Sequence, residues 1–256
     1  MKNSVAVVTG ASQGIGRSTA IRLARDFSAV VLAARNAEEL EEVAAAVKTA
    51  GAEALPLAVD LSKAEAPATV VDTTLKRFGR IDALLNIAGA VPQIDLFEMT
   101  DEQWNAGMEL KLHGARRLTI RAWDALKQAG GSVVFMSGSA ALDPKPAFAA
   151  VAATNAAITA LAKAFAEQGI KDGVQVNSIV PGPVMTGRRR SFLEKWAPAH
   201  KMSVEEAMKK FPEEAGISRY GEPEEIAELL GFMVSPAAKW MTGASLRMDG
   251  GEIKGI

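Results

Sequence analysis

Residues 5–16 read VAVVTGASQGIG, and this stretch decides the fold. A β-branched apolar run typical of a buried strand leads directly into three closely spaced glycines, Gly10, Gly14 and Gly16. A glycine-rich turn between a strand and a helix lets the backbone approach a pyrophosphate, whose charge the helix N-terminus stabilises. The stretch therefore predicts a dinucleotide-binding site at the start of an α/β domain, although the same turn alone could be an ordinary tight turn.

The rest of the chain alternates short apolar runs with helical patterns. Further strands are predicted at 29–36, 53–62, 81–89, 131–138, 173–182 and 244–251. Helices are predicted at 14–27, 37–51, 66–78, 101–129 and 147–169. Continuous apolar strands separated by helices are typical of a parallel sheet with both faces covered. We expect residues 1–256 to form a single α/β, doubly wound Rossmann-type domain with a sheet of about seven strands.

Composition excludes several other classes of protein. The chain has 256 residues, 48% of them hydrophobic, a net charge of −1 and no cysteine. This charge gives no general attraction to nucleic acid or to an anionic membrane. His113 and His200 lie far apart without ligand spacing, so no metal site is expected. The N-terminus has no signal-peptide pattern, and we expect a cytoplasmic protein.

Two segments depart from the simple alternation. Residues 147–166, AFAAVAATNAAITALAKAFA, are apolar enough to suggest a membrane segment, but Asn155 and Lys163 interrupt them. A packed helix of a water-soluble protein is the better interpretation. Residues 187–218 form a polar helical insertion after the sixth strand. An insertion at the carboxyl end of a strand is well placed to act as a lid over a bound substrate.

The end of the second strand bears on the choice of cofactor. An acidic residue there would bind the ribose 2′-hydroxyl of NAD, but Ala34 fills that position and Arg35 follows it. An arginine can pair with a 2′-phosphate, so NADP(H) is favoured, with NAD(H) as the alternative. Gln13, rather than a second basic residue, precedes Gly14, and a solvated Arg35 is the competing interpretation.

The motifs along the chain resemble those of the short-chain dehydrogenase/reductase (SDR) family over nearly its full length. The motifs are TGASQGIG at 9–16, NIAG at 86–89, PGPVMT at 181–186, RYGEPEEIA at 219–227 and MDGG at 248–251. This resemblance implies dinucleotide binding, a homo-oligomer (tetramer or dimer) and a small-molecule substrate. The implied cofactor-binding residues are Gly10, Ser12, Gln13, Gly14, Ile15, Gly16, Arg35, Asp60, Leu61, Asn86, Ala88, Gly89, Asn155, Pro181, Gly182, Val184 and Thr186.

The same resemblance implies that all four catalytic positions are changed. Val151 stands where the family has its tyrosine acid, and Asn155 where it has the lysine four residues later. Gly138 replaces the serine, and Lys111 replaces the helix asparagine. The only tyrosine of the chain, Tyr220, lies in another motif and is expected to be a packing residue.

Several residues could take over the missing chemistry. Ser137 and Ser139 flank Gly138, although turn hydrogen bonds are their more ordinary role. Lys111 could serve as an acid if burial lowered its pKa, and His113 lies two residues further on. The predicted lid carries Arg188, Arg189, Arg190, Phe192 and Trp196. The arginines form either a solvated face or a site for an anionic substrate group, and the two aromatic residues either cover a ligand or pack the lid.

Three functions remain open at this point. The first is an NADP(H)-binding oxidoreductase that transfers hydride to or from a small organic substrate, with ordinary ketone or alcohol activity placed in doubt. The second is a non-catalytic NADP(H)-binding sensor or partner subunit. The third is a non-redox enzyme on the same scaffold.

Overall fold

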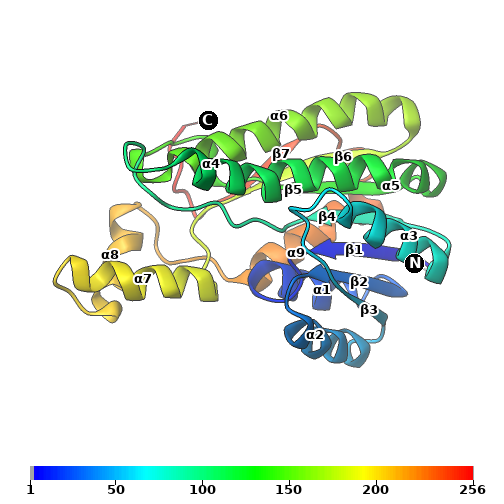
Figure 1. Ribbon diagram of the computed structural model, residues 1–256, viewed down its shortest axis with the longest axis horizontal. Coiled ribbons are helices and arrows are strands. Elements are labelled where there is room, and N and C mark those ends of the chain that lie inside the picture. The colour runs from blue at the N-terminus through cyan, green and yellow to red at the C-terminus, as the bar shows by residue number, and fades with distance from the viewer. Residues whose placement is uncertain (1–2, 256) are drawn as a thin grey trace.

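The computed structural model describes residues 3–255 and is organised around a seven-stranded parallel sheet in the order β3-β2-β1-β4-β5-β6-β7 (Figure 1). The strands are β1 Val5–Thr9, β2 Ala29–Ala34, β3 Glu53–Ala58, β4 Ala83–Asn86, β5 Ser132–Met136, β6 Gln175–Pro181 and β7 Ser245–Met248. At the centre, Val8 pairs with Leu32 on one side and with Leu85 on the other. The predicted doubly wound α/β fold is confirmed.

Helices cover both faces of the sheet, as Figure 1 shows. One face carries α1 Gly14–Leu23, α2 Ala37–Thr49 and α9 Pro223–Met233, and the other carries α3 Ala66–Phe78, α5 Ala115–Ala129 and α6 Ala149–Asp172. Each set buries its apolar side against the strands, in two separate clusters of buried side chains. Burial of this apolar area is the main force that holds the layers together.

Local signals at the helix ends agree with this arrangement. Asn36 follows β2, and its side chain accepts hydrogen bonds from the N–H groups of Glu38 and Glu39, which starts α2. Gly173 ends α6 in the left-handed conformation, with φ of +74°. Such caps satisfy backbone groups that a helix end leaves unpaired. The shorter 3-10 turns are η2 Ser139–Ala141, η3 Pro146–Phe148 and η4 Pro236–Ala238.

The helical segment predicted over 101–129 is confirmed, but it is not α-helical throughout. The structure divides it into α4 Asp101–Met108, the π-helical turn η1 Glu109–Gly114 and α5. At Gly114 a Cβ atom would lie 2.6 Å from the carbonyl oxygen of Leu61, so the widened turn lies directly against the loop after β3. π-turns of this kind frequently occur at functional sites.

Helix α6 is the segment whose composition suggested a membrane. Together with the turn before it, Pro146–Asp172 is long and apolar enough, by length and composition only, to cross one. In this structure, however, Ile158, Ala162 and Ala166 are buried in the cluster between α6 and the sheet. One side of α6 therefore packs on the sheet, as in the helices of proteins that do not cross a membrane, and its other side is exposed.

The insertion after β6 contains α7 Gly187–Ala199 and α8 Val204–Glu214. These helices project from the carboxyl end of the sheet (Figure 1). They have a small apolar cluster of their own, in which Leu193, Ala197, Ala207 and Tyr220 are buried. Tyr220 is therefore a packing residue near the insertion and does not lie on α6.

Candidate active site

A cavity of about 1460 Å³ lies at the carboxyl ends of the strands. Open α/β sheets bind ligands where the strand order reverses, which here is between β1 and β4. The predicted cofactor residues that line the cavity are Gly10, Ser12, Gln13, Gly14, Ile15, Gly16, Arg35, Leu61, Ala88, Gly89, Asn155, Pro181, Gly182 and Thr186. Within residues 3–255, Asp60, Asn86 and Val184 do not line it, and Val184 lines a smaller adjoining hollow of about 190 Å³.

The glycine turn leaves the N-terminus of α1 open to a ligand. Gln13 precedes the helix in an extended conformation without a side-chain capping bond, and the first turn carries no acidic residue. A Cβ atom at residue 16 would lie 2.0 Å from the carbonyl oxygen of Gly10, so the turn is too tight for any other residue. An uncapped helix N-terminus on a cavity wall suits an anion. This part of the cavity therefore fits the pyrophosphate of a dinucleotide.

Thr9 joins the glycine turn to the loop after β4. Its Oγ1 accepts hydrogen bonds from the N–H groups of Ile87 and Ala88 at 2.9 and 3.0 Å. Asn86, just before them, is buried, and its Nδ2 donates to Thr119 Oγ1 at 3.0 Å. Asn86 therefore supports the cavity wall from behind instead of forming part of it.

The loops after β2 and β3 form the far end of the cavity. Arg35 is exposed and lines this end, next to the capping residue of α2. Burial acts to raise the pKa of Asp60, but hydrogen bonds from Ser62 and the charges of Arg35 and Lys63 outweigh it and bring the pKa below its usual value. Asp60 is thus ionised at neutral pH and orders this loop through Ser62, whose N–H and Oγ donate to it at 3.0 and 2.8 Å.

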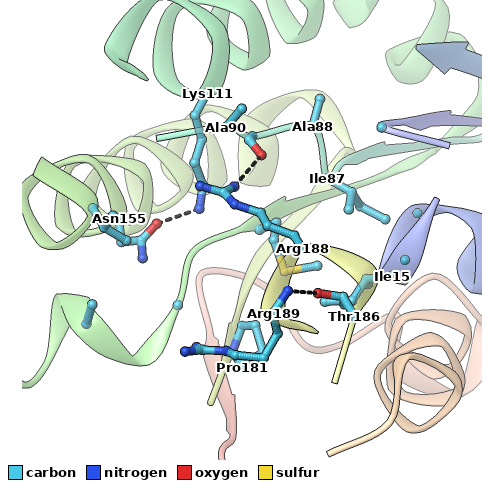
Figure 2. Close-up of a pocket in the computed structure, with 18 of the residues that line it drawn as sticks. Ile15, Ile87, Ala88, Ala90, Lys111, Asn155, Pro181, Thr186, Arg188 and Arg189 are labelled. Atoms are coloured by element: carbon cyan, nitrogen blue, oxygen red, sulfur yellow. Dashed lines mark hydrogen bonds between the residues drawn. The ribbon is translucent and has the colours of Figure 1, made fainter. Parts of the chain in front are cut away.

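The four predicted catalytic positions meet at the other end of the cavity, as Figure 2 shows for two of them. Lys111 extends from η1, Gly138 follows β5, and Val151 and Asn155 face the cavity from α6. The Nζ atom of Lys111 donates to Asn155 Oδ1 at 2.5 Å and to the carbonyl oxygen of Ser137 at 3.2 Å. The two residues therefore interact directly, although 44 positions separate them along the chain.

The environment of Lys111 changes its proton affinity. Burial, reinforced by the positive charge of Arg188, lowers the pKa of Lys111 from 10.5 to about 7. A lysine whose pKa lies near neutrality exists in both protonation states at pH 7 and can donate or accept a proton.

Two glycines make room for this pair of side chains. A Cβ atom at Gly89 would lie 2.9 Å from Lys111 Cδ, and one at Gly138 would lie 2.7 Å from Asn155 Nδ2. Real Cβ atoms essentially never approach other atoms as closely as this. The absence of a side chain at Gly138 and the orientation of the Asn155 amide are therefore sterically linked.

The other candidate substitutes are occupied elsewhere. Ser137 Oγ donates to the carbonyl oxygen of Asn155 at 2.9 Å and accepts from Thr159 Oγ1 at 3.0 Å. Ser139 lines the cavity, where its hydroxyl acts to lower the pKa of Glu252. His113 is half-buried on η1 and is not among the residues that line the cavity within 3–255.

The arginines of the insertion separate into two kinds. Arg188 and Arg189 line the cavity, whereas Arg190 is exposed and lies outside its lining within the described chain. Arg188 reaches back across the cavity (Figure 2), where its guanidinium donates to the carbonyl oxygens of Gly89 and Val91 at 3.1 and 2.5 Å. The three consecutive arginines are therefore not simply a solvated face, because Arg188 connects α7 to the loop after β4.

Aromatic packing explains the position of Arg189. Its guanidinium lies 5.6 Å from the ring centres of Phe192 and Phe211, at cation–π distance. Trp196 packs edge-on against Phe211 with ring centres 5.7 Å apart and lies outside the cavity lining in residues 3–255. Phe192 lines the smaller hollow, so of these two aromatic side chains Phe192 is nearer to a ligand.

Glu252 is a cavity residue that sequence reasoning missed. It lines the cavity after β7, and its buried Oε2 has no hydrogen-bond partner among residues 3–255. Burial raises the pKa of its carboxyl group, which the Ser139 hydrogen bond partly offsets. Its position directly after the MDGG motif was a signal for a role at the site, but the motif alone says nothing of side-chain direction.

Comparisons with known proteins agree with this geometry. A family model described as enoyl-(acyl carrier protein) reductase matches residues 10–252. The short-chain reductase protein NovJ of Streptomyces niveus is 32% identical, over 98% of this chain and 94% of that protein.

The crystal structure of L-sorbose reductase from Gluconobacter frateurii, complexed with NADPH and L-sorbose, superposes with a TM-score of 0.94 at 30% identity. The match covers 99% of this chain and 97% of the other. A structure of NAD⁺-bound xylitol dehydrogenase gives a TM-score of 0.90 at 27% identity, over 97% and 98% of the two chains. The chain belongs to the short-chain dehydrogenase/reductase family.

Proposed function

We propose that this protein is an NADP(H)-dependent oxidoreductase acting on a small organic substrate. The observation that carries the proposal is one continuous cavity that joins the uncapped N-terminus of α1 to the amine of Lys111. The dinucleotide, when bound, supplies or accepts a hydride at its nicotinamide ring. The chain's own residues hold it, shield the site from water and handle the proton.

Arg35 supports NADP(H) over NAD(H). It lies on the cavity wall at the end of β2, where a neutral Ala34 precedes it instead of an acidic residue. An arginine makes strong, charge-assisted hydrogen bonds to phosphate. The NADPH of the L-sorbose reductase complex is consistent with this choice, and the NAD⁺ of xylitol dehydrogenase keeps NAD(H) as the alternative.

The loop after β6 is suited to hold the nicotinamide end. Pro181, Gly182 and Thr186 line the cavity there, and the Thr186 hydroxyl also caps α7 by accepting from the N–H of Arg189 at 3.2 Å. A ligand bound to this loop therefore contacts the first turn of the insertion. We infer that α7 and α8 form a substrate lid, which Arg188 connects to the opposite wall.

Positive charge at this end favours a substrate with an anionic group. Lys111, Arg188 and Arg189 all line the cavity, where the charge of Glu252 acts on Arg189. Burial and a neighbouring positive charge lower the pKa of Lys111 and of Arg188, an effect that an anionic ligand would counteract.

The proposal is tested by dinucleotide binding followed by turnover. Purified protein is titrated with NADPH and with NADH by calorimetry, and loss of NADPH absorbance is then followed with ketones, imines and enones, each in neutral and carboxylate-bearing forms. We expect tighter binding of NADPH and turnover of at least one substrate, with the carboxylate-bearing form preferred. Failure to bind either dinucleotide contradicts the proposal.

A second candidate is a non-catalytic NADP(H)-binding sensor or partner subunit. It is favoured by Val151 and Gly138, which supply neither a proton nor a hydrogen bond from a side chain where the family has tyrosine and serine. Tight NADPH binding without turnover of any substrate in the panel would select it. Turnover that needs no dinucleotide would instead select non-redox chemistry on this scaffold.

We further propose a cytoplasmic homo-oligomer, a tetramer or dimer, without nucleic-acid or membrane partners. Helix α6 exposes a line of small residues, Ala153, Ala156, Ala160 and Ala164, while its opposite side packs on the sheet. Small side chains allow two helices to approach closely. Light scattering that shows only monomer at micromolar concentration contradicts this assembly.

A further inference from the structure

The amine of Lys111 makes two hydrogen bonds within the protein, which leaves one of its three N–H groups without an acceptor in the described chain. Its stem lies against Gly89, and Nζ donates to Asn155 Oδ1 and to the Ser137 carbonyl. A lysine ammonium has three donors, so a third remains for a group in the cavity. Within residues 3–255 no other hydrogen bond or ion pair engages Nζ, and the side chain lines the cavity.

The groups that face Lys111 are neutral or positive. Asn155 on α6 and the Ser137 carbonyl after β5 are neutral acceptors, and Gly89 in the loop after β4 has no side chain. Arg188 on α7 is the charged group whose effect on Lys111 is largest. On its own element, Glu109 is bound to Arg117 instead. A lysine without a carboxylate partner releases its proton more readily than a surface lysine.

The side chains around Lys111 at this end of the cavity have no proton that they could give to a substrate. Val151 has no acidic hydrogen, Gly138 has no side chain, and the Ser137 hydroxyl donates to the carbonyl oxygen of Asn155. Among the residues that line this end of the cavity, Lys111 has both a transferable proton and hydrogen bonds that fix its side chain. Asn155 accepts one of these hydrogen bonds through its Oδ1, and Gly138 leaves space for the Asn155 amide.

We infer that Lys111 is the catalytic residue that moves the substrate proton, and that Asn155 is the positioning residue that directs it; this rests on the hydride-transfer function proposed above. In reduction of a carbonyl, the carbon receives the hydride, the π-electron pair moves onto oxygen, and Nζ of Lys111 gives that oxygen a proton. The product is an alcohol, the dinucleotide is oxidised, and the neutral amine regains a proton from water. In oxidation the neutral amine accepts the hydroxyl proton.

The first part of the test measures the proton affinity of Lys111 without any turnover. The Nζ resonance of Lys111 is titrated by NMR in isotope-labelled protein, with Lys111→Met used for assignment. We expect an apparent pKa near 7, against 10.5 for an ordinary lysine. Asn155→Asp should raise this pKa, because a carboxylate stabilises the charged amine, and Asn155→Leu should lower it, because the ammonium loses an acceptor. An ordinary pKa that neither variant shifts overturns the inference, whether or not the protein is active.

The second part measures chemistry with the substrate found in the turnover panel. Lys111→Met should lower kcat by about 10²–10⁴-fold, the usual value of a positioned acid, while the Kd for NADPH stays close to that of the wild type. Lys111→Arg should not restore kcat, because arginine keeps the charge but does not release its proton. Lys48→Met, on the exposed side of α2 and outside the cavity lining of the described chain, is the matched control and should retain full activity.

The pH profile connects the two parts. Reduction requires the protonated amine, so kcat should fall as pH rises through the pKa of Lys111, and the midpoint should move upward in Asn155→Asp. Full activity of Lys111→Met, or a loss that appears only as weaker NADPH binding, overturns the inference and leaves the proposed function standing. A wild-type protein whose Lys111 titrates near 7 but which turns over no substrate overturns the proposed function, and the catalytic role of Lys111 with it.

Discussion

The two ends of the cavity are built in different ways. At the glycine turn the backbone itself forms the site, and a Cβ atom at Gly16 would lie 2.0 Å from the Gly10 carbonyl oxygen. At the Lys111 end the site consists of side chains, and the four positions predicted to be catalytic, Lys111, Gly138, Val151 and Asn155, all line the same cavity. A backbone site tolerates little change because its atoms cannot be exchanged. A side-chain site can be rebuilt from a neighbouring element, as Lys111 and Asn155 illustrate.

The largest expected effect is at the glycine turn. Gly16→Ala places a methyl group against the Gly10 carbonyl, and forcing atoms into a packed site of this kind costs about 1–3 kcal/mol, occasionally more. We expect a large drop in thermal stability and loss of measurable NADPH binding, by calorimetry. Gly255→Ala, where a Cβ atom meets nothing within 4 Å and the residue lies outside the cavity lining of the described chain, is the control and should behave like the wild type. Equal behaviour of the two variants would show that the turn is not as tight as described.

The lowered pKa of Lys111 should make the free energy of unfolding depend on pH. The unfolded chain keeps the Lys111 proton up to pH 10.5, whereas the folded protein releases it at about pH 7. Wild-type stability should therefore rise between these values relative to Lys111→Met, with a limiting slope of about 1.4 kcal/mol per pH unit. Below about pH 7 the full penalty of burying the charged amine is present. Urea unfolding of both proteins across this range measures the difference, and parallel curves would contradict a buried, perturbed Lys111.

A substitution of Arg35 tests whether the end of the cavity near the glycine turn prefers NADPH to NADH. Arg35→Ala should weaken NADPH binding by roughly 10–100-fold, the value of one charge-assisted hydrogen bond, and leave NADH binding nearly unchanged. Calorimetry with both dinucleotides gives the ratio. An equal loss for both would mean that Arg35 does not distinguish the 2′-phosphate.

The smallest effect concerns the steric link between Gly138 and Asn155. Gly138→Ser introduces the residue that the family resemblance predicts at this position, but its Cβ would lie 2.7 Å from Asn155 Nδ2. The amide must move, at a cost of about 1–2 kcal/mol, and the melting temperature should fall by a few degrees. In the Asn155→Ala background the same serine should be tolerated, because the obstructing amide is gone. Additive effects of the two changes would contradict the coupling.

Much of the fold could be predicted because its signals are local. The run VAVVTGASQGIG places a strand, a tight turn and a helix within one short segment, and Asn36 and Gly173 mark helix ends next to them in sequence. The π-turn at Glu109–Gly114 could not be predicted in the same way. It accompanies a close approach between Gly114 and Leu61, which are distant in sequence.

The sequence by itself determined the doubly wound sheet and the glycine turn, and it predicted the four residues Lys111, Gly138, Val151 and Asn155 that the structure places on one cavity. Those features depend on hydrophobic periodicity and on residue types at fixed spacings, both of which a chain carries locally. Only the tertiary structure decided that Lys111 donates to Asn155, that Arg188 crosses to the loop after β4, and that Glu252 lines the cavity. Burial and the partners of a charge are set by elements that meet in space, so the proton affinity of Lys111 becomes apparent only once the fold has assembled around it.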